Sequence, residues 1–175
     1  PAFARSPRVI DDNDRVSLRG NVHPNARPEF DAGPAEPNLP MERMILTLHL
    51  PPEKKQKLDQ LLSEQHDPAS ANYQHWLTPE EFAERFAPDP EDLAAINGWL
   101  TAQGFTIDEV SRGRTSINFS GDVAKVEKAF RTKIHKYQVE GKTHHANAKD
   151  PEIPRGLAEV VAGVAHEINN PVSLI

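Results

Sequence analysis

Proline positions divide this chain into a central part that can fold readily and two flanking parts that cannot. Proline fixes the backbone angle φ and has no N–H group to donate, so it interrupts helices and central strands. The 16 prolines concentrate in the first forty residues and near the C-terminus. Between Pro1 and Pro40 the apolar residues are isolated and too few to bury much surface. We therefore predict an extended N-terminal arm over residues 1–40, a folded domain over residues 41–164, and a C-terminal linker or the start of a following domain over residues 165–175.

The first half of the central region predicts one strand followed by two helices. Apolar residues alternate with other residues from Met44 to Leu50, which is typical of a strand with one face on a core. After two prolines, leucines recur at helical spacing and indicate an amphipathic helix from Glu53 that ends near His66. A second, short helix is expected to begin at Pro79, because Thr78 can cap it. Two phenylalanines of this helix should face the same side: Phe82 and Phe86.

The second half predicts a longer helix, a pair of strands, another helix and a last strand. Asp89-Pro90 marks the start of the longer helix and Gly104 closes it. The buried stripe of this helix is Leu93, Ile96, Trp99 and Leu100. We expect antiparallel strands over 105–110 and 115–119, a helix capped by Ser120, and a strand over 133–139.

This order of elements favours an α+β fold. Strand, helix, helix, strand, strand, helix and strand is a split βαβ pattern with one inserted helix. We therefore predict a ferredoxin-like antiparallel sheet covered by helices, preceded by the extended N-terminal arm. Trp76 and Trp99 both lie at helical spacing to other apolar residues, so we expect both in the core rather than in a ligand pocket.

Composition argues against several classes of function. The formal net charge is -6 and no cluster of five Lys or Arg residues occurs, so we expect no nucleic-acid partner. No apolar run approaches the roughly 18 residues that span a bilayer, so we expect no membrane partner either. The chain has no cysteine, which excludes disulfides and thiolate metal sites.

A search for catalytic patterns indicates that this chain is not an enzyme. It contains no G-x-S-x-G turn and no glycine-rich phosphate loop, and Ser120 is explained more simply as a helix cap. His144 and His145 are adjacent, so on an extended backbone their side chains point apart and do not form a two-ligand metal site. We expect no catalytic residue, no metal and no cofactor in this chain.

One short motif suggests a different class of function. Residues 166–171 read H-E-x-x-x-P, which resembles the phospho-acceptor box of sensor histidine kinases, with His166 as the acceptor. Such a box needs the rest of a helical hairpin and a separate ATP-binding domain. Three interpretations remain: a chance match, an effect of where the chain is cut, or a sensor or interaction module fused to a histidine kinase.

Many ordered segments between residues 42 and 163 carry a more specific resemblance. They include Asn72-Tyr73-Gln74-His75-Trp76-Leu77-Thr78-Pro79, Ser111-Arg112-Gly113-Arg114-Thr115, Phe119-Ser120-Gly121, Ile134-His135-Lys136-Tyr137 and Val160-Val161-Ala162-Gly163. Together these segments resemble the pro-kumamolisin activation domain, the propeptide of the bacterial and related sedolisin-family serine-carboxyl peptidases.

The resemblance implies a function for the chain. A propeptide of this kind is an intramolecular chaperone and inhibitor of a sedolisin-type endopeptidase, and acid-triggered proteolysis removes it. The Ser-Glu-Asp triad and any calcium site belong to the peptidase domain, which is the expected partner. The resemblance also implies a zymogen that is secreted or extracytoplasmic. Its sheet should pack on the peptidase, and the segment after Gly163 should lead toward the active-site cleft.

Three histidines are candidates for sensing acid. His135, His144 and His145 lie in a predicted strand and the loop after it, and histidine changes charge in the pH range through which acid-activated peptidases pass. We predict that one or more of them contributes to release of the propeptide at low pH.

Overall fold

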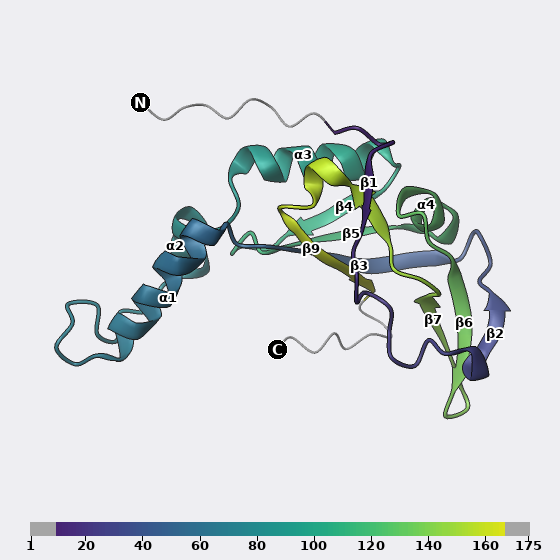
Figure 1. Ribbon diagram of the computed structural model, residues 1–175, viewed down its shortest axis with the longest axis horizontal. Coiled ribbons are helices and arrows are strands. Elements are labelled where there is room, and N and C mark those ends of the chain that lie inside the picture. Colours follow the sequence, from purple (N-terminus) through teal and green to yellow (C-terminus); the bar gives the residue numbers. More distant parts are fainter. Residues whose placement is uncertain (1–9, 167–175) are drawn as a thin grey trace.

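The computed structural model describes the backbone of residues 10–166 and the side chains of residues 10–165. Within this range the elements are, in order, β1 (Arg15–Ser17), η1 (Pro28–Phe30), β2 (Asp31–Pro34), β3 (Pro40–Leu48), α1 (Pro52–His66), α2 (Pro79–Phe86), α3 (Pro90–Ala102), β4 (Thr106–Val110), β5 (Ser116–Asp122), α4 (Val123–Ala129), β6 (Ile134–Val139), β7 (Lys142–Asn147), β8 (Glu152–Pro154), η2 (Arg155–Leu157) and β9 (Val161–His166). All strand pairs are antiparallel, so the predicted α+β class is confirmed (Figure 1).

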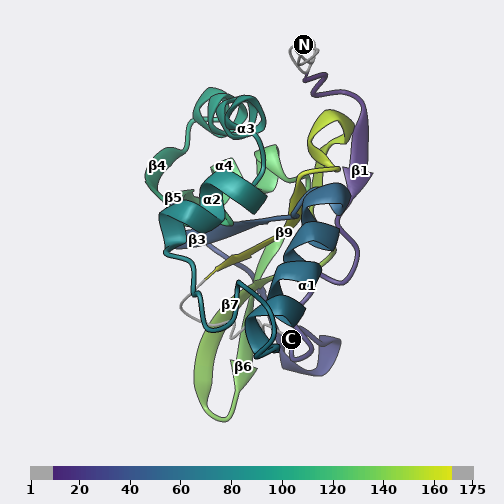
Figure 2. The same cartoon turned by 90° about the vertical axis from the view of Figure 1, so that its left-hand side faces the viewer.

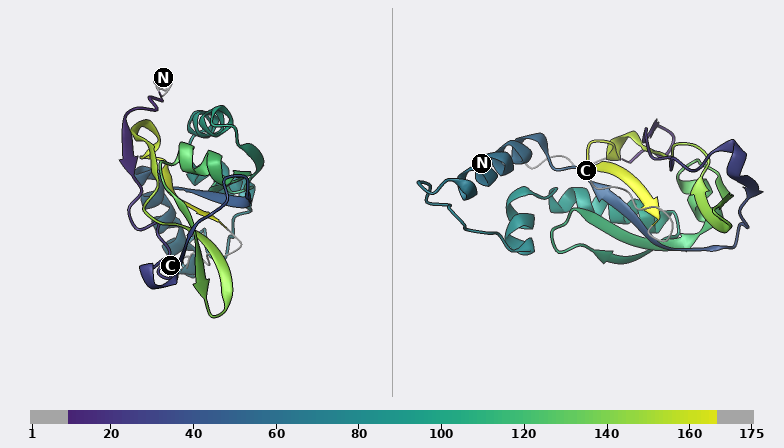
Figure 3. Two further views of the ribbon diagram at one scale, coloured as in Figure 1. Left: turned by 90° about the vertical axis from the view of Figure 1, so that its right-hand side faces the viewer. Right: turned by 90° about the horizontal axis from the view of Figure 1, so that it is seen from below.

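The main sheet has four strands in the order β4-β5-β3-β9. Strand β3 lies inside it, and the predicted alternation is present: Met44, Leu46 and Leu48 are buried, whereas Ile45 and Thr47 point to the other face. Helices α3 and α4 cover the face that carries the buried residues (Figure 1). In the described part of the chain no helix covers the opposite face (Figure 3).

The ferredoxin-like sheet that we predicted is not confirmed, because the strand expected to complete it lies elsewhere. Strand β6 pairs with β2 and β7 in a separate sheet, and the fourth strand of the main sheet is β9. The physical reason is local: Glu140 and Gly141 both have positive φ and form a tight turn between Val139 and Lys142. Such a turn favours pairing of β6 with the strand that follows it.

Two further sequence predictions concern the ends of helices. Gly104 has a φ of 87° and follows α3, as expected for a glycine that closes a helix. The cap of α4 was predicted wrongly: it is Asp122, whose carboxylate accepts the N–H of Lys125 at 2.9 Å, and not Ser120. The Ser120 hydroxyl donates instead to Asp108 on the neighbouring strand β4.

The segment from Ile10 to Pro40 lies on the folded domain. Strand β1 pairs with β8, and β2 pairs with β6. The guanidinium of Arg15 donates to the carbonyl of Ala129 at 2.6 Å, and Leu18 is buried in the main core. The N-terminal part of the chain is therefore held by long-range contacts that its own sequence pattern does not indicate.

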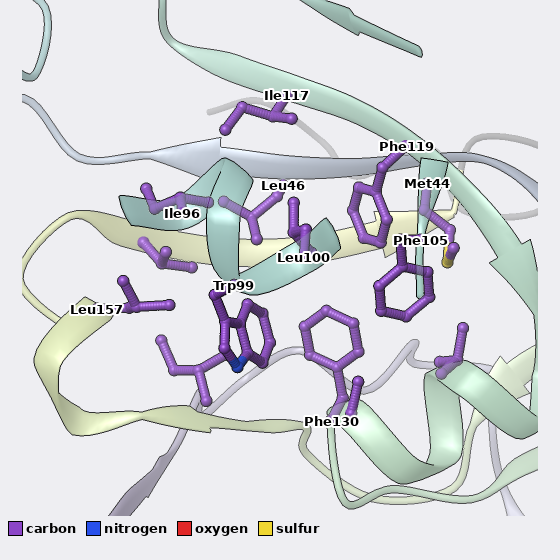
Figure 4. Packing of buried hydrophobic residues seen from close by; sticks show 14 of the residues in the cluster. Met44, Leu46, Ile96, Trp99, Leu100, Phe105, Ile117, Phe119, Phe130 and Leu157 are labelled. Atoms are coloured by element: carbon purple, nitrogen blue, oxygen red, sulfur yellow. The ribbon is translucent and has the colours of Figure 1, made fainter. Parts of the chain in front are cut away.

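Aromatic side chains fill the centre of the main core (Figure 4). The ring centroid of Trp99 is 5.4 Å from that of Phe130, and Phe105 is 5.1 Å from Phe119, both edge to face. The indole Nε1 of Trp99 donates to Asp12 at 3.0 Å. Burial alone would raise the pKa of Asp12, but this hydrogen bond and the contacts of Arg15 outweigh it and lower the pKa.

Helices α1 and α2 form a hairpin that projects from one end of the molecule (Figures 1 and 2). We call residues 52–86 the hairpin and the rest of the described domain the body. The cap predicted at Thr78 is present, because its hydroxyl accepts from the N–H of Glu81. The Glu81 carboxylate accepts in turn from the Thr78 N–H, which completes a capping box. Phe82 and Phe86 lie together, with ring centroids 5.5 Å apart, as expected.

Candidate functional site

The uncovered face of the main sheet is the first candidate surface for binding another protein. Its outward-pointing side chains are half-buried and, apart from Ile45, small or polar: Ile45, Thr47, Ser116, Asn118, Ser120 and Ala165. Gly163 on β9 belongs to the same face but is buried, with Asn21 beside it. A broad cavity of about 760 Å³ lies over one side of this face and is lined by residues that include Arg43, Asp108 and Asn118. Such a face presents few bulky side chains and can lie flat against a partner.

The edge strand β9 is fixed by an asparagine from the N-terminal segment. The Asn21 side-chain oxygen accepts the N–H of Val164 at 3.0 Å, and the Asn21 N–H donates to Asp150 at 2.9 Å. A Cβ atom on Gly163 would stand 2.7 Å from the same Asn21 oxygen, so a larger residue here would displace the Asn21 side chain. The contact defines where the last described strand runs along the sheet.

The hairpin carries the second candidate surface. The large hydrophobic side chains that are exposed in the described part of the chain are Leu62, Tyr73 and Trp76, with exposed fractions of 44%, 38% and 64%. All three lie on the hairpin (Figure 2). The prediction that Trp76 is a core residue is therefore wrong, whereas the same prediction for Trp99, which is 5% exposed, is confirmed.

The loop that presents Trp76 is held by hydrogen bonds to the end of α1. The side-chain amide of Gln65 donates to the carbonyl of His75, and the N–H of Gln74 donates to the carbonyl of Gln65 at 3.1 Å. Asn72 donates to the carboxylate of Glu64 at 2.6 Å. The loop is thus tied to α1 at three points, which positions the indole ring of Trp76 on the outside of the hairpin.

The three histidines proposed as acid sensors lie at two places in the small sheet. His135 on β6 faces Asp31 on β2, with its Nδ1 2.8 Å from a carboxylate oxygen. The backbone N–H of Gly33 and the His135 ring lower the pKa of Asp31. This contact joins β6 to β2 and helps to keep Asp31 ionised.

His144 and His145 lie on β7 and line a cavity of about 320 Å³ together with His23. Burial, followed by the nearby charges of Lys136 and His144, lowers the pKa of His145. Burial and the proximity of His144 also lower the pKa of His23. Sequence reasoning missed His23, because no local pattern places it beside residues more than a hundred positions away.

The alternative phospho-acceptor His166 is the last described residue. Its backbone belongs to strand β9 and pairs with Met44, so it is extended at this point. The remainder of the H-E-x-x-x-P motif, residues 167–171, lies outside the described residues. The histidine-kinase interpretation therefore stays a prediction that the structure does not test.

Other kinds of site were sought over the part of the chain with assigned positions. Across residues 10–165, no group of three or more His, Asp or Glu side chains is arranged to hold a metal ion. No described helix is both long and apolar enough to cross a bilayer. The uncovered sheet face and the hairpin are consequently the surfaces on which a functional interpretation rests.

Comparison with known proteins identifies the family. Residues 31–169 match the family described as "Pro-kumamolisin, activation domain". The chain belongs to this family. It is the activation domain, or propeptide, of sedolisin-family peptidases, as the sequence resemblance predicted.

Relatives of this activation domain come from bacteria, fungi and mammals. It is 30% identical over 121 residues to sedolisin of Pseudomonas sp. (strain 101), an alignment that covers 69% of this chain and 20% of that protein. It is 33% identical over 97 residues to xanthomonalisin of Xanthomonas sp. (strain T-22), covering 55% of this chain and 12% of that protein. Tripeptidyl-peptidase sed1 of Aspergillus fumigatus is 32% identical over 101 residues, covering 55% of this chain and 16% of that protein. The activation domain thus spans at most a fifth of the length of these relatives.

Proposed function

We propose that this activation domain is an intramolecular chaperone and inhibitor of a sedolisin-type serine-carboxyl endopeptidase, and that acid-triggered proteolysis removes it. The observation that carries this proposal is the family match over residues 31–169, which covers the hairpin and the body from β2 onward. The chain itself would perform no catalysis. Its precursor would be secreted, as is typical of sedolisin-family proteins.

The proposed mechanism is binding that favours one state of the peptidase domain. A ligand stabilises the state to which it binds in proportion to its differential affinity for that state. A body that folds around its own core would supply a preformed surface while the peptidase is still incompletely folded. The uncovered face of the sheet β4-β5-β3-β9 supports this role, because its small side chains permit close approach of a second domain.

Inhibition follows from the same binding. In this proposal the sheet face stays on the folded peptidase domain, and the segment after Gly163 runs toward the active-site cleft. The close contact between Gly163 and Asn21 supports the proposal, since it fixes the strand from which this segment leaves. A bound propeptide would then keep substrate out until it is cut.

Acid would loosen the complex through histidines that are neutral and partly desolvated. Burial lowers the pKa of both His23 and His145. The folded domain therefore keeps both rings neutral at pH values where an exposed histidine is already protonated. The small sheet that carries His145 should therefore become less stable as the pH falls. The contacts that lower the pKa of Asp31 would be lost at still lower pH, when Asp31 takes up a proton.

Refolding of the peptidase domain of the same precursor, with and without this chain added, tests the proposal. We expect the added chain to raise the yield of active enzyme and to inhibit the enzyme once it has folded, near neutral pH more than at pH 4. The chain alone should hydrolyse no peptide. Equal yields with and without the chain, together with no inhibition, would contradict the proposed function.

A further inference from the structure

The hairpin buries few side chains for helices of its length, so its own packing contributes little to its stability. Helix α1 has 15 residues, yet the only residues that it buries are Leu61 and Gln65. Isolated helices of this length are marginal in water, and most helical stability in proteins comes from packing of an apolar face. Among the described elements, α2 is the main packing partner of α1. A helix in this position needs a further partner to become as stable as the body.

The tip of the hairpin presents a defined apolar patch. Leu62 and His66 lie one turn apart on α1, and the His66 ring meets the ring of Trp76 edge to face with centroids 6.0 Å apart. The Nδ1 of His66 lies 2.7 Å from the Leu62 carbonyl. Tyr73 is in the same loop as Trp76. We call Leu62, His66, Tyr73 and Trp76 the tip patch.

The tip patch has the composition of a binding hot spot rather than of ordinary surface. Tryptophan and tyrosine are enriched among the interface residues whose truncation costs the most binding energy. Their large rings bury much area for little loss of side-chain freedom. The Trp76 indole is 64% exposed but its loop is anchored to α1, so little ordering would be needed on binding.

Charge around the tip patch limits the kind of partner that fits it. The stretch from Leu58 to Glu84 contains no Lys or Arg, and its carboxylates are Asp59, Glu64, Asp67, Glu80, Glu81 and Glu84. A partner surface with a basic rim would complement this charge. Two hairpin tips facing each other would place like charges together, which disfavours a second copy of this chain as the occupant.

We propose that the tip patch docks into an apolar pocket with a Lys- and Arg-containing rim on the peptidase domain of the same precursor. This contact is distinct from the one made by the uncovered sheet face, and the inference rests on the proposed function. The lengths of the relatives support the peptidase domain as the partner. The alignments cover only 12–20% of those proteins, so most of each relative lies outside the region that resembles this chain. The hairpin thereby gains the packing that the body does not provide.

The test compares Trp76→Ala with the wild type and with Gln56→Ala, a matched change at an exposed position on α1. The inhibition constant of each full chain is measured against the mature peptidase domain of the same precursor near neutral pH. We expect Trp76→Ala to weaken inhibition by roughly 30-fold or more and Gln56→Ala by less than about twofold. Raising the salt concentration should slow association of the wild type.

Denaturant melts of the same proteins separate binding from folding. The chain has two tryptophans, so Trp99 remains in the Trp76→Ala variant and reports on the body. We expect an unchanged midpoint, since the Trp76 side chain is mostly exposed.

A wild-type chain that inhibits and a Trp76→Ala variant that inhibits equally well would overturn this inference alone. A wild-type self-dimer that Trp76→Ala disrupts without changing inhibition would also overturn it, in favour of a second copy. A wild-type chain that fails to inhibit would instead overturn the proposed function, and this inference with it.

Discussion

The body and the hairpin are built in opposite ways. Phe119, Phe130, Leu46 and Ile117 are almost completely buried in a continuous core that joins the sheet to α3 and α4. The hairpin has only a small separate group of buried apolar residues: Leu61, Ala83 and Phe86. It exposes three large hydrophobic side chains, whereas the described body exposes none of comparable size. The body therefore has a continuous core of its own, whereas in our proposal the packing of the hairpin is completed by the peptidase domain.

The attachment between the two regions is polar and narrow. The ammonium group of Lys54 contacts the Ala87 carbonyl and the Asp89 carboxylate, both at 2.7 Å. Glu80 on α2 pairs with Arg112 on the turn after β4 at 2.6 Å, and both of these side chains are well exposed. Exposed ion pairs contribute little to stability, typically below about 1 kcal/mol.

Replacing each tryptophan with alanine gives the largest expected contrast between the two regions. Trp99→Ala removes a ring that is 5% exposed, packs on Phe130 and bonds to Asp12, so we expect it to lower the free energy of unfolding by about 3–5 kcal/mol. Trp76→Ala should change it by less than about 0.5 kcal/mol. Urea melts of both variants make the comparison, and similar losses would show that the hairpin shares the core of the body.

Two glycines of the body test how tightly it is packed. Gly163→Ala would push the Asn21 oxygen away from the N–H of Val164, and we expect a loss of about 1–2 kcal/mol in the free energy of unfolding. Gly98→Ala in α3 meets no atom within 4 Å, so it should stabilise by roughly 0.5–1 kcal/mol. Thermal melts of both variants check the signs. A stable Gly163→Ala variant would mean that Asn21 does not hold strand β9.

A change at the cap of α2 should affect the hairpin alone. Thr78→Ala removes the hydroxyl that accepts from the Glu81 N–H and should cost about 1 kcal/mol of local stability. Hydrogen exchange should become faster in residues 79–86, while amides in α3 keep their wild-type rates. Thr78→Ser, which retains the hydroxyl, serves as the control. Faster exchange in α3 would show that the two regions unfold together.

The smallest expected effect is on the pH dependence of stability. Burial lowers the pKa of His23 and His145 in the folded chain, so the unfolded chain binds more protons in that range. Stability should fall as the pH drops from the ordinary histidine pKa of about 6.5 toward the folded values. His144, Lys136, Lys142, Glu140 and Tyr137 also face or line this region.

A variant that carries His23→Gln and His145→Gln should lack this first loss of stability. It should retain the loss at lower pH, because hydrogen bonds keep the pKa of carboxyls such as Asp31 and Asp122 below their ordinary values. Urea melts between pH 7 and pH 4 compare the variant with the wild type. Identical profiles would assign the acid response to the carboxyls alone.

Sequence patterns predicted the elements whose signals are local. The cap at Thr78, the helix between Pro90 and Gly104, and the alternation along β3 each depend on residues a few positions apart. Strand β7 reads Lys-Thr-His-His-Ala-Asn and was interpreted as a loop, because it has no apolar alternation and forms through its turn with β6. The pairing of β1 with β8 likewise depends on contacts more than 130 residues apart.

The candidate sites were less predictable than the fold. Trp76 was expected in the core because its spacing to other apolar residues matches that of Trp99, and spacing alone does not reveal which helices lack a neighbour. His144 and His145 could be chosen from sequence, but their partner His23 could not, since only the folded chain brings it to the same cavity. A binding surface is recognised by its exposure in the folded chain, and the spacing of residues in a single sequence does not show which apolar side chains stay exposed.

Hydrogen exchange of the chain, measured alone and bound to the peptidase domain of the same precursor, tests whether the partner completes the hairpin. A peptidase variant without its catalytic serine prevents cleavage during the measurement. We expect amides in residues 61–77 to exchange faster than those of α3 in the free chain and to slow by at least about tenfold in the complex, while α3 changes little. An inhibitory complex in which residues 61–77 exchange as fast as in the free chain would contradict the claim.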